Sequence, residues 1–116
     1  MVIGFPETSL PAAPQRWRFD NTGAVAHEIS IIPISATFSE DDLAYVLGLP
    51  DDATPTPGKP WLDYAPIAGI GVMNAGLSSW LDIDLPAGRY LALCPAPFGT
   101  GYPHVMDGMY AFLDLA

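Results

Sequence analysis

The chain has 116 residues, of which 50% are hydrophobic, so it is long and apolar enough for one domain with its own core. It carries 13 acidic and only 4 basic residues, and the resulting formal net charge of −9 argues against nucleic-acid binding. A single cysteine excludes a disulfide within the chain, and no stretch reaches the ~18 apolar residues of a membrane span.

The first half of the sequence predicts short strands. The 13 prolines and 11 glycines are spread along the chain and divide it into short segments, as in all-β proteins. Val2–Phe5 is a possible first edge strand. In Gln15–Asp20 two aromatic residues alternate with charged ones, which predicts a strand with one buried face. Asn21–Gly23 then predicts a turn, and the β-branched residues of Ile29–Ile34 predict the next strand.

The middle of the chain departs from this strand pattern. Ser39–Leu47 begins with a good N-cap residue, has three acidic residues in its first turn and continues with apolar residues at helical spacing. We expect one short helix here. Leu49–Asp63 is rich in Pro, Gly and Asp and predicts a long irregular connection, whereas Ile67–Met73, with two internal glycines, fits either a weak strand or a loop.

The last third returns to strands. Ser79–Leu85 alternates between apolar and polar residues, Pro86–Gly88 predicts a turn, and Arg89–Cys94 and Met109–Leu115 predict two further strands. The sequence therefore predicts an all-β Greek-key β-sandwich of about seven or eight strands with one inserted helix, as a single domain over residues 1–116. The tryptophans are expected to lie in the core or to cover it: Trp17, Trp61 and Trp80.

The strongest metal-binding side chains are few, and most of them lie close together in the sequence. Cys94, His104 and Met109 follow the spacing C-x9-H-x4-M, with the cysteine at the end of one predicted strand and the methionine at the start of the next. The loop between them is rich in Pro and Gly, so one connection could hold a thiolate, an imidazole and a thioether around a point. His27, just before the Ile29–Ile34 strand, could complete the set from a neighbouring strand end.

This combination of donors favours copper. Two imidazoles and one thiolate in a plane, with a weak axial thioether, suit both oxidation states of a single copper ion, so electrons move with a small reorganisation cost. Met106 and Met73 compete with Met109 for the thioether role. Any of these side chains could instead be an ordinary buried or hydrogen-bonded residue. No arrangement of residues supports an enzymatic activity.

Several segments together resemble the cupredoxins. The matching residues are Phe19–Gly23, His27-Glu28, Leu85–Tyr90, Cys94, Pro103-His104 and Gly108-Met109. The C-terminal loop is most similar to that of the copper nitrite reductases and of small plastocyanin- and azurin-like bacterial domains. The resemblance implies that His27, Cys94 and His104 bind one copper ion in a plane and that Met109 is the axial ligand. A second, catalytic copper would need further histidines that the chain lacks, which argues against nitrite reduction by this chain alone.

The resemblance also implies a function and a location. It predicts a type 1 (blue) copper protein that transfers electrons to and from redox partner proteins in transient complexes, and it favours the periplasm or the extracellular space. Glu28 stands where many blue copper proteins have an Asn that ties the two ligand loops together; it is either an acceptor for a ligand loop or a surface carboxylate. The alternative is a cupredoxin-like binding or structural module that has no redox role or only handles copper.

Overall fold

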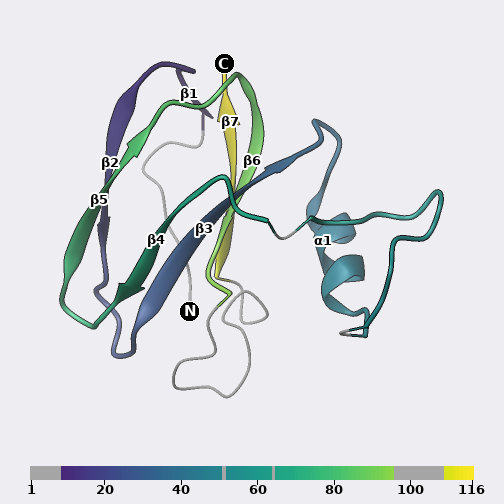
Figure 1. Ribbon diagram of the computed structural model, residues 1–116, viewed down its shortest axis with the longest axis horizontal. Helices are drawn as coiled ribbons and strands as arrows, with labels where there is room; N and C mark the ends of the chain where they lie inside the picture. The colour runs from purple at the N-terminus through teal and green to yellow at the C-terminus, as the bar shows by residue number, and fades with distance from the viewer. Residues whose placement is uncertain (1–8, 51, 64, 96–108) are drawn as a thin grey trace.

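The computed structural model describes residues 9–50, 52–63, 65–95 and 109–116. Its strands form two layers, a five-stranded sheet in the order β1-β7-β6-β3-β4 and a two-stranded sheet of β2 and β5 (Figure 1). The elements are β1 (Ser9–Leu10), β2 (Gln15–Asp20), β3 (His27–Ile34), α1 (Glu40–Leu47), β4 (Ala68–Met73), β5 (Ser78–Ile83), β6 (Gly88–Leu93) and β7 (Tyr110–Leu115). The predicted β-sandwich with one helix is confirmed, while the possible strand at Val2–Phe5 lies outside the described residues.

The centre of the large sheet is antiparallel. β3 pairs with β6 from Ser30 opposite Leu93 to Ile34 opposite Arg89, and β6 pairs with β7 along its whole length. β4, which the sequence left as a strand or a loop, is a strand on the other side of β3. A Cβ atom on Gly69 would lie 2.5 Å from the carbonyl oxygen of Ile29, so the close approach of β4 to β3 requires glycine at this position.

The space between the two sheets holds the larger of two hydrophobic cores, which we call the sandwich core. Its buried residues are Ile29, Ile31, Met73, Tyr90, Ala92, Cys94, Met109, Leu113 and Leu115. Trp17 and Phe19 of β2 and Leu81 of β5 pack against it from the small sheet. Since side chains alternate between the faces of a strand, Tyr90 and Ala92 of β6 belong to this core, and so does Cys94, the residue that follows the strand. The sequence predicted these three residues on one face.

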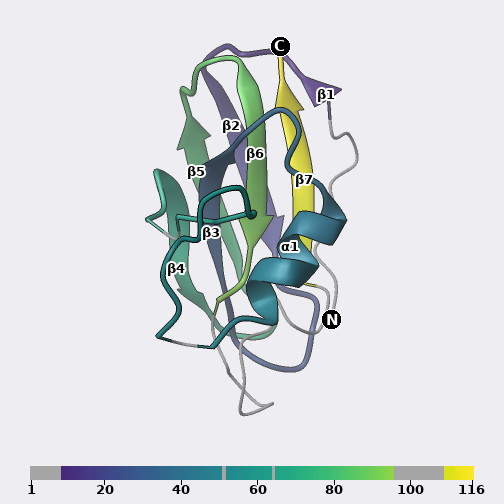
Figure 2. The ribbon, with the colours of Figure 1, turned by 90° about the vertical axis from the view of Figure 1, so that its right-hand side faces the viewer.

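The opposite face of the large sheet is also buried, because α1 covers it (Figure 2). The residues of this helix-side core are Ile32, Phe38, Leu43, Val46, Leu62, Leu91 and Leu93. The helix begins with a capping box: the hydroxyl of Ser39 accepts from the N–H of Asp42, and the Asp42 carboxylate accepts from the N–H of Ser39. β6 is thereby buried on both faces, a feature that no pattern in the sequence predicted.

The prediction for the tryptophans is right for one residue and wrong for two. Trp17 packs against the sandwich core, but Trp80 is 59% exposed and Trp61 is 38% exposed. The alternation of β5 explains Trp80, since Ile83 and Leu81 face inward and leave the tryptophan on the outer face. There the guanidinium of Arg18 lies over the indole ring, 5.6 Å from its centroid.

One exposed ion pair and one side-chain hydrogen bond join the two strands of the small sheet, and a second ion pair lies within β2. Arg16 donates to Asp82 at 2.6 Å, and Asp20 accepts from Arg18 and from the hydroxyl of Ser78. These hydrogen bonds lower the pKa of Asp82 and of Asp20, chiefly through Arg16 and Ser78 respectively. A lowered pKa in the folded state stabilises the protein above the unfolded pKa, and this contribution is lost as the pH falls. It is small, because water screens groups this exposed.

We expect Leu43→Ala to lower the free energy of unfolding by about 2–5 kcal/mol, because Leu43 is fully buried in the helix-side core and its truncation leaves a cavity. The matched control is Leu77→Ala, since Leu77 is 53% exposed and its loss should change the value by less than about 0.5 kcal/mol. Urea titration followed by circular dichroism measures both. Equal effects in the two variants would show that α1 adds nothing to the core.

Candidate metal centre

His27 is held at the start of β3 with a fixed ring orientation. The side chain is only 7% exposed, and its Nδ1 atom lies 4.0 Å from the Sγ atom of Cys94. The other ring nitrogen faces the preceding turn, where a Cβ atom on Gly23 would lie 3.2 Å from Nε2. The imidazole therefore directs Nδ1 to the sulfur and Nε2 to the turn.

Cys94 follows β6 directly and is completely buried. Its backbone N–H donates to the carbonyl of Met109 at 3.1 Å, which joins the two ends of the C-terminal connection. Its Sγ atom accepts a hydrogen bond from the backbone N–H of Glu28 at 3.5 Å. This bond links the cysteine to the residue next to His27, across 66 positions in the sequence. The Glu28 N–H thus positions the sulfur, and the Met109 carbonyl positions the backbone of Cys94.

The hydrogen bond between Glu28 and Cys94 explains how the site can have a glutamate where many blue copper proteins have an asparagine. An Asn side chain was expected to tie the ligand loops in this family, and here a backbone N–H makes the contact to Cys94. The side chain of residue 28 is not needed for that bond, and this residue is half-buried near the start of β3. Glutamate at this position is therefore compatible with the same sulfur hydrogen bond.

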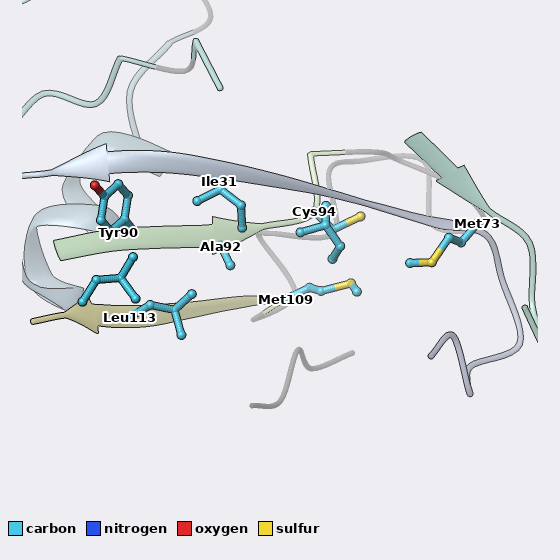
Figure 3. Packing of buried hydrophobic residues seen from close by; sticks show 9 residues of the cluster. Ile31, Met73, Tyr90, Ala92, Cys94, Met109 and Leu113 are labelled. Carbon is cyan, nitrogen blue, oxygen red and sulfur yellow. The ribbon is translucent and has the colours of Figure 1, made fainter. Parts of the chain in front are cut away.

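Two methionines lie at the same end of the sandwich core as Cys94. Met109 is 6% exposed and Met73 is 4% exposed, and both belong to the cluster that contains the cysteine. Figure 3 shows the Met73 side chain pointing from β4 toward Cys94 and Met109. Met73 also pairs with His27 in the β3–β4 ladder. The structure therefore brings Met73, one of the competing thioethers, to the site together with Met109.

Of the four predicted ligands, the structure brings three to one end of the sandwich: His27, Cys94 and Met109. The fourth, His104, lies outside the described residues, as does Met106. The role of all four as ligands remains a prediction, and so does the likeness of the C-terminal loop to that of nitrite reductases.

The chemistry of these donors fits copper better than a harder cation. In the described part of the chain the buried polar or charged side chains are Asn21 and His27, so no buried carboxylate is present there to suit magnesium or calcium. An imidazole, a thiol and two thioethers are soft or intermediate donors, and this set with a weak thioether is typical of mononuclear copper. The surrounding side chains are apolar, which keeps water away from the sulfur.

We expect Gly23→Ala to displace the His27 ring, because the new methyl group would lie 3.2 Å from Nε2, closer than an ordinary contact. The imidazole signals in the NMR spectrum of the metal-free protein should shift, and the free energy of unfolding should fall by about 1 kcal/mol. Gly71→Ala is the control, since a Cβ atom there would meet nothing within 4 Å. Unchanged His27 signals in Gly23→Ala would mean that the turn does not fix the ring.

Comparison with known proteins identifies the fold. No protein-family profile and no curated sequence matches the chain. Among solved structures, auracyanin B covers 96% of this chain and 78% of its own, with a TM-score of 0.57 and 24% identity. Dithionite-reduced auracyanin from Roseiflexus castenholzii also covers 96% of this chain and 86% of its own, with a TM-score of 0.55 and 23% identity. Auracyanins are cupredoxins. The resemblance read from the sequence is therefore confirmed at the level of architecture, and the chain has the cupredoxin fold.

Proposed function

We propose that this protein is a type 1 copper protein that carries single electrons through one copper ion. The observation that supports this most directly is the approach of His27 Nδ1 to within 4.0 Å of Cys94 Sγ at a buried strand end. The two side chains lie within hydrogen-bonding reach of one another, and at this separation both donor atoms could also contact a single ion. The same buried end also contains thioether sulfur.

In this proposal His27, Cys94, His104 and Met109 would hold the copper ion. A bound copper ion would supply a one-electron couple between Cu(II) and Cu(I). The protein residues would hold the donors in one geometry for both states: the Glu28 N–H fixes the sulfur, and the Cys94 N–H fixes the carbonyl of Met109. A framework that does not rearrange keeps the barrier to electron transfer low.

The charge of the protein favours a basic redox partner. Of the 4 basic residues, Arg16, Arg18 and Arg89 each lie within 4 Å of an aspartate, and this leaves most of the 13 acidic groups without compensation. An excess of negative charge speeds association with a positively charged partner, and the effect weakens as salt increases. The partner would take or give one electron in a transient complex, in the periplasm or outside the cell. No helix in the described ranges is long and apolar enough to cross a membrane.

A second candidate is copper handling without electron transfer. It is favoured by the thiol and two thioethers at one end of the core, because soft sulfur donors prefer Cu(I). The two functions differ in how they bind Cu(II). An electron carrier binds both oxidation states in one geometry, whereas a Cu(I) carrier has little affinity for Cu(II) and no intense colour.

Titration of the reduced, metal-free protein with Cu(II), followed in the visible spectrum, tests the proposed function. We expect an intense thiolate-to-copper charge-transfer band that saturates at one equivalent. Cys94→Ser should abolish this band while circular dichroism still reports a folded β-sandwich, because serine supplies no thiolate. A colourless wild-type protein, or colour that survives Cys94→Ser, would contradict the assignment.

Paired substitutions separate the two thioethers of the described residues. Met109→Leu should raise the reduction potential by about 59 mV or more, a tenfold change in a one-electron equilibrium, because loss of a weak thioether donor would favour Cu(I). Met73→Leu conserves the volume and should leave the potential nearly unchanged. Spectroelectrochemical titration measures both. The opposite result would make Met73 the thioether ligand, and no shift in either variant would leave Met106 as the remaining candidate.

A further inference from the structure

Asn21 stands out because it is a buried polar residue with no assigned role. It lies directly after β2, on the turn that leads to His27, and is 4% exposed. Apart from His27, it is the only buried polar side chain in the described ranges. A buried amide is costly unless its donors and acceptor are paired, so the contacts of Asn21 show what the residue holds in place.

Every polar group of the Asn21 side chain has a backbone partner. The Nδ2 atom donates one hydrogen bond to the carbonyl of Val25 and another to the carbonyl of Met73, both at 2.9 Å. The Oδ1 atom accepts from the N–H of Gly23 at 3.1 Å. One amide therefore spans the turn before His27 and, across 52 positions of sequence, the end of β4.

The backbone of Asn21 makes a second connection to the same region. Its N–H donates to the carbonyl of Leu77 at 2.9 Å, and its carbonyl accepts from the N–H of Gly76 at 2.8 Å. Both partners belong to the turn between β4 and β5. The turn that carries His27 is thus fastened to the β4–β5 turn through side-chain and backbone groups of one residue.

The partners of this amide flank His27 directly. Val25 is two residues before the histidine, Met73 is its partner in the β3–β4 ladder, and Gly23 lies against its Nε2 atom. Moving any of them would move the ring. On the other side of the histidine, the backbone N–H of Glu28 bonds the sulfur of Cys94. The contacts of Asn21 therefore hold the segment before the histidine, and the Glu28 bond holds the segment after it.

We propose that Asn21 is the positioning residue of the metal centre: its amide clamps the 21–27 turn to the end of β4 and so fixes His27 Nδ1 opposite Cys94 Sγ. The relevance to copper rests on the proposed function, but the clamp itself can be tested without metal. Asn21→Asp keeps the size and the acceptor to Gly23, yet places a carboxylate against the carbonyls of Val25 and Met73. Asn21→Ser removes both donors without adding charge and serves if the aspartate variant does not fold.

The first measurement is the rate at which Cys94 reacts with an aromatic disulfide reagent in the metal-free protein. Wild-type Cys94 is fully buried, so its reaction requires the site to open. We expect Asn21→Asp to react about tenfold faster or more, since a buried group that loses its hydrogen bonds favours the open state. Asn74→Asp is the matched control, because Asn74 is an exposed residue at the end of β4 and undergoes the same chemical change.

A second control separates positioning from general stability. Leu43→Ala weakens the helix-side core, on the far face of the sheet from the site. At denaturant concentrations where Leu43→Ala and Asn21→Asp have equal global stability, only the Asn21 variant should show the faster thiol reaction and altered His27 imidazole signals. Equal rates in these two variants, or an Asn21→Asp rate equal to that of wild type, would overturn the clamp.

The second measurement uses the copper-loaded protein. The intensity ratio of its thiolate-to-copper charge-transfer bands reports the geometry around the sulfur, and this ratio should change in Asn21→Asp but in neither Asn74→Asp nor Leu43→Ala. An unchanged ratio would overturn the role of Asn21 at the metal. If wild-type protein binds no copper, the proposed function fails, and the thiol rates and His27 signals alone decide whether Asn21 positions the histidine.

Discussion

The pairing of β3 with β6 is the constraint on which the candidate centre depends. Their antiparallel register ends with Ser30 opposite Leu93, so Cys94 emerges beside the start of β3, where His27 and Glu28 lie. The hydrogen bond from Glu28 N–H to the cysteine sulfur follows from that register, as does the short distance to the imidazole. A shift by one residue would turn Cys94 to the other face of the sheet and separate the donors.

The two cores make this pairing rigid. The sandwich core covers one face of β6 and the helix-side core covers the other, so the strand that ends at Cys94 packs on both sides. Burial also removes water from the sulfur and leaves apolar side chains around it. A dry, stiff environment favours a centre that keeps one geometry through oxidation and reduction. The exposed strand edges and ion pairs of the small sheet lie on the outside and contribute little to this rigidity.

Most elements could be predicted because their signals are local. Alternation defined β2 and β5, the capping residues around Ser39 defined α1, and the glycine and proline turns separated the strands. Trp80 was misjudged because its size suggested the core, whereas the alternation of β5 turns it outward. β4 was ambiguous because its glycines weaken the strand signal, and only the close approach of Gly69 to β3 explains why they are there. The helix-side core could not be predicted, because no local sequence pattern indicates which face of the sheet a helix will cover.

The sequence by itself determined the chemical inventory: one thiol, two imidazoles, 4 methionines and an acidic net charge of −9, with donors in an order that points to copper. It also determined the strands, because side-chain periodicity and turn residues are properties of short segments. Only the tertiary structure decided that His27 Nδ1 faces Cys94, that Met73 joins Met109 beside the cysteine, and that Asn21 clamps the histidine turn to β4. The first and last of these join residues more than 50 positions apart, and the second joins residues from three different segments. Their formation depends on the register of the strands and on the packing of two cores, which no local pattern encodes.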